Sequence, residues 1–218
     1  MNDLIWLALG WVAYATLHSL LASLRCKAWV TRRWPGFVPY YRLGFNLQSV
    51  ILVLPLIWAT WAIPGDWLWR WTGIGAWIAN GLALAALAGF WLSAGAYDLG
   101  EFLGFTPLRE RRRDAVEHDG LRISPLHRFV RHPWYALCLV LIWTRDMNAP
   151  LLVSALAITL YFAIGSRLEE RKLETRFGAA YREYRQRVPG LIPLPWKRLT
   201  AAEAEALMQG SRHRQHEL

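Results

Sequence analysis

Two groups of charged side chains stand at the ends of two neighbouring apolar runs. Arg131 and His132 precede the run that begins at Trp134, and Glu169 and Glu170 follow the next run. Charges at membrane helix ends are expensive, so a cluster of them is a candidate site. If the two runs form a helical hairpin, the groups face each other on one side of the membrane. Such a cluster can bind an anionic group or take a proton from a neutral one.

Simpler interpretations of these residues remain open. Basic side chains at helix ends snorkel, and exposed ion pairs need no chemistry. His132 could only cap the loop, and Phe177 and Tyr184, at helical spacing, could be plain packing. His18, inside the first apolar run, is either part of a site or satisfied by a neighbouring helix. Composition alone does not choose between these interpretations.

Membrane helices must position these residues. The 218 residues are 55% hydrophobic and 19% charged, with the apolar residues in long runs, so one membrane domain over residues 1–218 is expected. The pattern predicts an all-α integral membrane protein with five transmembrane helices, the last two forming a C-terminal hairpin. Amphipathic cytosolic helices are predicted after it. The predicted spans are residues 4–24, 43–63, 74–96, 132–144 and 149–166.

The basic residues of the short loops predict the orientation. With five spans every strongly basic segment falls on one side, which puts the N-terminus outside and the C-terminus in the cytoplasm. The formal charge of +9 then reflects this bias and contact with anionic membrane lipids, and no nucleic-acid partner is expected. Cys26 and Cys138 lack metal-type spacing, so free thiols and no bound metal are expected.

The segments around the hairpin lead to three further predictions. The run from Trp134 to Trp143 spans only about 15 Å as a helix, so Arg131 and His132 are expected in a protein-lined cavity at or just beneath the cytoplasmic interface. Gly178 interrupts the amphipathic pattern and is expected to allow close helix approach. Residues 200–203 match a capping box that opens a tail helix, expected on the solvent or lipid surface.

Fixed positions over residues 120–193 carry a family resemblance. Arg131-His132-Pro133-x-Tyr135 is followed by Glu169-Glu170-x-x-Leu173-x-x-x-Phe177-Gly178-x-x-Tyr181-x-x-Tyr184-x-x-x-Val188-Pro189-x-x-Ile192-Pro193. This combination resembles the C-terminal signature of the isoprenylcysteine carboxyl methyltransferase and phospholipid methyltransferase superfamily. Residues 17–23 and 41–43 look like the openings of small bacterial members, among them methanethiol S-methyltransferases.

The resemblance implies a membrane methyltransferase, in the bacterial inner membrane, with S-adenosyl-L-methionine entering from the cytosol. Arg131 and Glu170 are the catalytic residues it implies, with Arg131 or Arg128 holding an anionic acceptor and Glu169 or Glu170 taking a proton. The acceptor stays open: a lipophilic molecule or a small thiol, carboxylate or amine. The implied cofactor-binding residues are His132, Tyr135, Glu169, Phe177, Tyr181 and Tyr184.

Two other functions fit the same superfamily. A sterol-reductase-like enzyme would bind NADPH with a similar C-terminal half, although this chain has few spans for a sterol pocket. A non-catalytic membrane scaffold would need no charges at the hairpin ends, where this sequence keeps Arg131, His132, Glu169 and Glu170.

Overall fold

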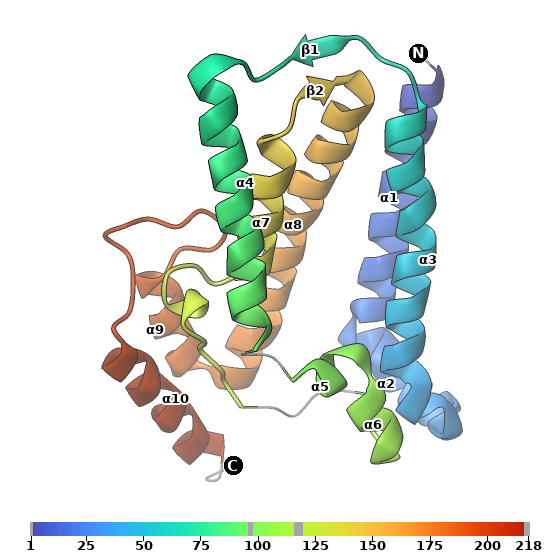
Figure 1. Ribbon diagram of the computed structural model, residues 1–218. Helices are drawn as coiled ribbons and strands as arrows, with labels where there is room; N and C mark the ends of the chain where they lie inside the picture. Colours follow the sequence, from blue (N-terminus) through green and yellow to red (C-terminus); the bar gives the residue numbers. More distant parts are fainter. Residues whose placement is uncertain (1, 96–97, 116–119, 216–218) are drawn as a thin grey trace. The chain divides into compact units, whose positions relative to one another are not determined.

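The computed structural model describes residues 2–95, 98–115 and 120–215 (Figure 1). Nearly all of the regular structure in this part of the chain is helical, as the apolar runs predict. The chain divides into two compact units. Unit 1 holds residues 2–70, 98–115 and 146–158, and unit 2 holds residues 71–95, 120–145 and 159–215. Ala96, at the end of the third predicted span, lies outside the described residues.

Unit 1 is built on two antiparallel apolar helices, α1 and α3. Gly10 lets them approach closely, because a Cβ atom there would lie 2.7 Å from Leu56, and at the other end the Tyr41 hydroxyl donates to the Leu21 carbonyl at 2.6 Å. The elements of the unit are α1 (Asn2–Ala22), α2 (Leu24–Arg33), the 3₁₀ helix η1 (Pro35–Tyr40), α3 (Tyr41–Ala62), β1 (Trp67–Trp69), α5 (Leu99–Leu103), α6 (Phe105–Arg109), β2 (Met147–Asn148) and the first turns of α8 (Ala149–Phe177).

Neutral hydrogen bonds join the helices of unit 1. The indole of Trp11 donates to the Ser154 hydroxyl at 2.8 Å, and Ser154 lies 2.6 Å from the buried Thr60 hydroxyl. The His18 ring lies 2.9 Å from the Ser49 hydroxyl and packs on Phe45. A neighbouring helix therefore provides His18 with a partner, as one of the two interpretations requires.

A short antiparallel pair joins two connections of unit 1. Trp67 of β1 pairs with Asn148 of β2, and Trp69 pairs with Met147, which is fully buried. The sequence predicts only a tryptophan-rich connection and a polar hairpin turn here. Strands of two and three residues are too short to show the alternation that identifies a strand.

Unit 2 holds the helical hairpin and the C-terminal helices. Helix α4 runs antiparallel to α7. Ser93 accepts a hydrogen bond from the Trp134 indole at 2.9 Å, and one turn earlier in α4 a Cβ atom at Gly89 would lie 2.9 Å from Leu137, which follows Trp134 in α7. The elements of the unit are α4 (Gly73–Ala94), η2 (Leu126–Arg128), α7 (Pro133–Trp143), the rest of α8 (Ala149–Phe177), α9 (Ala179–Arg187) and α10 (Ala201–Gln215).

Helix α7 lies along α8 as the predicted hairpin requires. The Trp143 indole donates to Thr159 at 3.0 Å, and the rings of Tyr135 and Phe162 stack at 4.4 Å. The last predicted span ends at residue 166, and the helix that contains it continues to Phe177, since α8 is 29 residues long. A helix of this length extends about 43 Å, more than the roughly 30 Å of hydrocarbon, so its charged end projects beyond the apolar layer.

Several helices of the described residues are long and apolar enough to cross a membrane. They are α1, the stretch Pro35–Ala62 that joins η1 to α3, α4 and α8, while α7 is apolar but shorter. Together with the composition, these helices identify the chain as an α-helical integral membrane protein.

The end of the chain forms a core rather than a surface appendage. Ala204 and Leu207 of α10 pack with Tyr181 and Tyr184 of α9, so the predicted surface position of the tail helix is wrong. Its capping box is confirmed: the Thr200 hydroxyl accepts from the Glu203 N–H at 3.3 Å, and the Glu203 carboxylate accepts from the Thr200 N–H at 2.7 Å. A short capping motif fixes where a helix begins but not what its faces touch.

Gly178 separates α8 from α9 and has a different role from the predicted one. Nothing lies within 4 Å of the position that a Cβ atom would take, so no close helix approach occurs there. Its φ of 56° and ψ of −125° lie where L side chains are strained. The glycine therefore ends α8 by its backbone conformation.

Candidate functional site

A turn after α9 fixes the backbone of the charged cluster in unit 2. The Arg131 N–H donates to the Pro189 carbonyl at 2.8 Å, and the His132 N–H donates to the Gly190 carbonyl at 3.1 Å. Pro133 then begins α7 at a position where a missing N–H costs no helical hydrogen bond. The segment before α7 is thereby held against the turn that follows α9.

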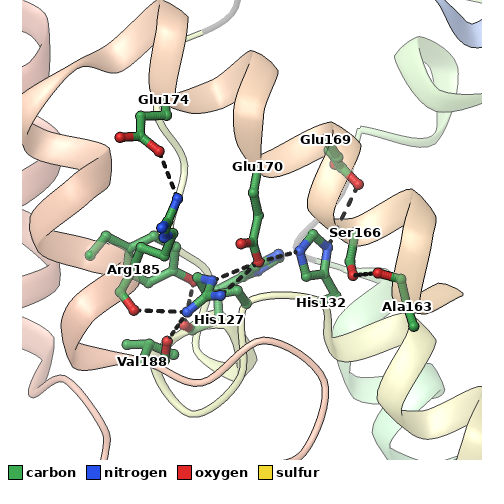
Figure 2. Close-up of polar contacts among 11 residues, drawn as sticks. His127, His132, Ala163, Ser166, Glu169, Glu170, Glu174, Arg185 and Val188 are labelled. Carbon is green, nitrogen blue, oxygen red and sulfur yellow. Dashed lines mark hydrogen bonds and ion pairs between the residues drawn. The ribbon is translucent and has the colours of Figure 1, made fainter.

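Arg131 connects Glu170 of α8 to Arg185 and Val188 at the end of α9. Figure 2 labels these three partners. The Nε of Arg131 donates to Oε1 of Glu170 at 2.9 Å, and Nη2 lies 2.7 Å from the same oxygen. Its Nη1 donates to the carbonyl of Arg185 at 2.9 Å and to that of Val188. The side chain is only 11% exposed, while the predicted protein-lined cavity at the cytoplasmic interface stays a prediction. Most of its donors are engaged within the protein, and this favours a positioning role.

His132 lies between two carboxylates. Its Nε2 is 3.0 Å from Oε1 of Glu170, and its Nδ1 is 3.6 Å from Oε2 of Glu169. The ring stacks on Tyr135 with an interplanar angle of 8°, and Tyr135 also stacks on Phe162. Glu169, Glu170 and Tyr135 therefore hold the His132 ring in one orientation.

The two glutamates of the pair differ in how they are used. Each hydrogen bond and ion pair that Glu170 makes with a described residue involves Oε1, which leaves Oε2 as a hydrogen-bond acceptor. The side chain is 10% exposed. Glu169 is 50% exposed and reaches His132 only at 3.6 Å. A buried, ion-paired carboxylate suits the binding of a hydroxyl, whereas a half-exposed carboxylate suits exchange of a proton with an arriving molecule.

Three residues beside the cluster were not predicted. The Cβ position of Gly190 lies 3.4 Å from Nη2 of Arg131 and 3.7 Å from Oε1 of Glu170, so the turn at this glycine covers the ion pair. Phe162 and the buried Ser166 precede Glu170 by eight and four residues on α8, one face of a helix. Following that helical spacing back from Glu170 into the apolar run would have identified both, while Gly190 offered only its place in the turn.

Two titratable groups next to the cluster are perturbed. Burial, together with a smaller effect of the nearby His132, lowers the pKa of His127 to about 4. The His127 ring lies 2.7 Å from the Ser124 hydroxyl, and its carbonyl accepts from the Tyr184 hydroxyl at 2.7 Å. Burial also raises the pKa of Tyr181, with Glu170 adding to the effect. His127 is thus neutral at pH 7, and Tyr181 stays a phenol.

The structure brings together five of the predicted site residues and places the other three in a core. Arg131, His132, Tyr135, Glu169 and Glu170 form one connected cluster. The other three belong to the C-terminal hydrophobic core, and their predicted contact with a cofactor stays a prediction: Phe177 is 8% exposed, Tyr181 1% and Tyr184 3%.

No group of three or more metal-ligating side chains is placed to hold an ion within residues 2–95, 98–115 and 120–215. The charged and titratable groups of the cluster are a guanidinium, an imidazole and two carboxylates. These groups can bind hydroxyls and transfer a proton.

Curated relatives match most of the chain. Methanethiol S-methyltransferase 2 of Bradyrhizobium diazoefficiens is 33% identical over 187 residues, which cover 83% of this chain and 69% of that protein. The methanethiol S-methyltransferase of Pseudomonas deceptionensis is 32% identical over 193 residues, with the same two coverages of 83% and 69%. That of Mycobacterium tuberculosis is 31% identical over 195 residues, 84% of this chain and 75% of that protein. No family model and no solved structure matches the chain.

Proposed function

Since this chain belongs to the methanethiol S-methyltransferase family, a branch of the isoprenylcysteine carboxyl methyltransferase superfamily, we propose that it methylates a small thiol with S-adenosylmethionine as the donor. Membership makes the chain a membrane methyltransferase. The donor and the acceptor are the proposed part. The observation that carries the donor is the buried Glu170, ion-paired to Arg131 through Oε1 while Oε2 stays available to a ligand. The names of the relatives support the acceptor.

The residues of the cluster fit the proposed donor. Oε2 of Glu170 can accept from ribose hydroxyls, a charge-assisted hydrogen bond of the stronger kind. Arg131 fixes that carboxylate and holds the turn that carries Gly190. Its remaining Nη2 proton and the His132 ring are the groups for the donor carboxylate, and the aromatic rings of unit 2 suit an adenine and a sulfonium. The sulfonium supplies a methyl group that a nucleophile can take by in-line displacement.

Glu169 is the better base of the pair. Glu170 accepts from both Arg131 and His132, and stabilising its charged form makes it a weaker proton acceptor. Glu169 is half-exposed and can take the proton of a thiol S–H as the sulfur forms its new bond to carbon. His132, 3.6 Å from Glu169, orients that carboxylate. The role of Arg131 as the holder of an anionic acceptor stays a prediction beside this positioning role.

The proposal includes five membrane crossings, with the N-terminus outside and the C-terminus in the cytoplasm of a bacterial inner membrane. The pairing of Trp67 with Asn148 supports this arrangement. The α3–α4 connection and the α7–α8 turn lie together in that pair, and both belong on the outer side if α7 crosses. The cluster of Arg131 and Glu170, at the opposite ends of α7 and α8, then faces the cytoplasm, where the donor is present.

Product analysis with a labelled donor tests the function. The purified full chain in detergent is given S-adenosylmethionine with a deuterated methyl group, together with methanethiol, a prenylated cysteine or a phospholipid amine. We expect deuterated dimethyl sulfide from methanethiol, and its loss in the Glu169→Gln variant. Label appearing only in a prenyl ester or a methylated lipid would overturn the acceptor.

The same preparation tests the two alternative functions. The names of the relatives favour neither the reductase nor the scaffold. Oxidation of NADPH without methyl transfer would support the reductase. Failure to bind S-adenosylhomocysteine at all would support the scaffold and overturn the methyltransferase mechanism.

A further inference from the structure

An open groove of about 830 Å³ lies where α1 meets α2 in unit 1. Residues at the C-terminal end of α1 and along α2 line it. On α2 the lining includes Arg25, Ala28, Trp29 and Arg32, which share one helix face by their spacing. The same face thus presents apolar and cationic side chains together.

The apolar side chains that line the groove are about half exposed. Leu20 is 59% exposed, Leu24 47% and Trp29 48%. Another face of α2 is used for packing, since Val30 is only 4% exposed. Apolar side chains gathered on the free face of a helix end that follows a membrane span point to acyl chains as their surroundings.

The cationic part of the groove has no acidic counterpart among the described residues. Arg25 and Arg32 are exposed and make no ion pair with any residue that the structure describes. They stand seven residues apart, about 10 Å along the helix axis. Their charges flank the apolar floor formed by Trp29 and its neighbours. The charge that fits between them is therefore negative and is attached to an apolar chain.

From these contacts we infer that the α1–α2 groove binds one anionic phospholipid. Its phosphate lies between Arg25 and Arg32, and an acyl chain lies along Trp29 and Leu20. Arginine is suited to phosphate by its planar set of donors, and an indole suits the depth of the headgroup. The site is separate from the proposed methyl transfer, and neither depends on the other.

Retention of lipid by the purified full chain tests the site. The protein is extracted from vesicles that contain equal amounts of phosphatidylglycerol and phosphatidylcholine with identical acyl chains, and the bound lipid is counted by native mass spectrometry. We expect one phosphatidylglycerol retained with a preference of roughly 30-fold, the combined effect of two arginines at a membrane surface. Substitution of both Arg25→Ala and Arg32→Ala should remove that preference.

Matched variants keep the test specific. Replacing Arg33 and Arg198 by alanine removes the same charge from two exposed positions that do not line the groove, and this variant should keep the preference. A Trp29→Gln variant, with both arginines intact, should lose most of the retained lipid. An equal loss in the Arg33 and Arg198 variant would show a diffuse charge effect and overturn the site. Displacement by glycerophosphoglycerol, the same headgroup without chains, would overturn the lipid as the occupant.

Discussion

Both compact units bury polar side chains among apolar helices, but with different chemistry. In unit 1 the Trp11 indole, Ser154 and Thr60 satisfy one another as neutral donors and acceptors. In unit 2 the carboxylate of Glu170 accepts from the Arg131 guanidinium and the His132 imidazole on one oxygen and keeps the other available. Unit 1 shows that a buried polar residue in a membrane helix can be explained by packing alone. The buried Glu170 of unit 2 combines charge with unused hydrogen-bonding capacity, and this combination marks a candidate site.

The Glu170→Gln variant tests the contrast between the two units most directly, because it removes the charge of the side chain and keeps its shape. We expect the affinity for S-adenosylhomocysteine to fall by about 2–3 kcal/mol, roughly 100-fold, because Arg131 loses its carboxylate and a ligand hydroxyl loses a charged acceptor. Calorimetry of the purified protein measures the change, and methyl transfer should fall with it.

Glu174→Gln is the matched control, because Glu174 lies one turn further along α8 and pairs with Arg185 at 2.7 Å outside the cluster. It should bind the ligand normally. Equal affinities in both variants and in the unaltered protein would remove Glu170 from the site and erase the contrast between the units.

Ser154→Ala tests the other side of the comparison. The variant leaves the buried Trp11 indole and the Thr60 hydroxyl without their shared partner, so we expect the free energy of unfolding to fall by about 1–3 kcal/mol. The turnover number of the folded protein should not change. Unfolding in mixed detergent micelles and activity at low temperature measure the two quantities. A loss of turnover at unchanged stability would give unit 1 a chemical role.

The pH dependence of stability sharpens the electrostatic part of the contrast. The folded protein holds the pKa of His127 at about 4, below an ordinary value of about 6.5, so the unfolded chain binds the proton more tightly. Stability from this residue is complete above the ordinary value and falls as the pH drops toward 4. Between pH 7 and pH 5 we expect a loss of about 2 kcal/mol.

His127→Gln should flatten this part of the stability curve, because an amide does not titrate in the range. Unfolding is followed at pH 7, 6 and 5 for both proteins. If the curves of the variant and the unaltered protein stay parallel, His127 is not the group that titrates.

The smallest expected effect is that of Gly178→Ala between α8 and α9. The position has a φ of 56° and open space around it, so only backbone strain is introduced, about 1 kcal/mol. Thermal unfolding measures it, and Gly165→Ala is the control, since that glycine lies inside α8 with equally open surroundings. Alanine at 165 should be neutral or slightly stabilising. Equal destabilisation in both variants would contradict a role for the unusual φ.

The sequence by itself predicted the helical membrane fold, the hairpin and the charged cluster. Long apolar runs have one outcome in a membrane, because every backbone hydrogen bond must be made within the segment. A related reason identified Arg131, His132, Glu169 and Glu170. Placing charge beside an apolar run costs free energy that packing alone does not offset. The ends of α1, α3, α4 and α7 fell within two residues of the predicted spans.

Only the tertiary structure decided which atoms meet. It showed that Oε1 of Glu170 receives Arg131 and His132 while Oε2 does not, and that Gly190 covers their ion pair. It also moved α10 from the expected surface into a core with Tyr181. These outcomes depend on contacts between segments far apart in the chain, whereas hydropathy, spacing and caps describe neighbours within one segment. A local pattern can fix where a helix begins and which residues are charged, but the partner across the interface is chosen by packing.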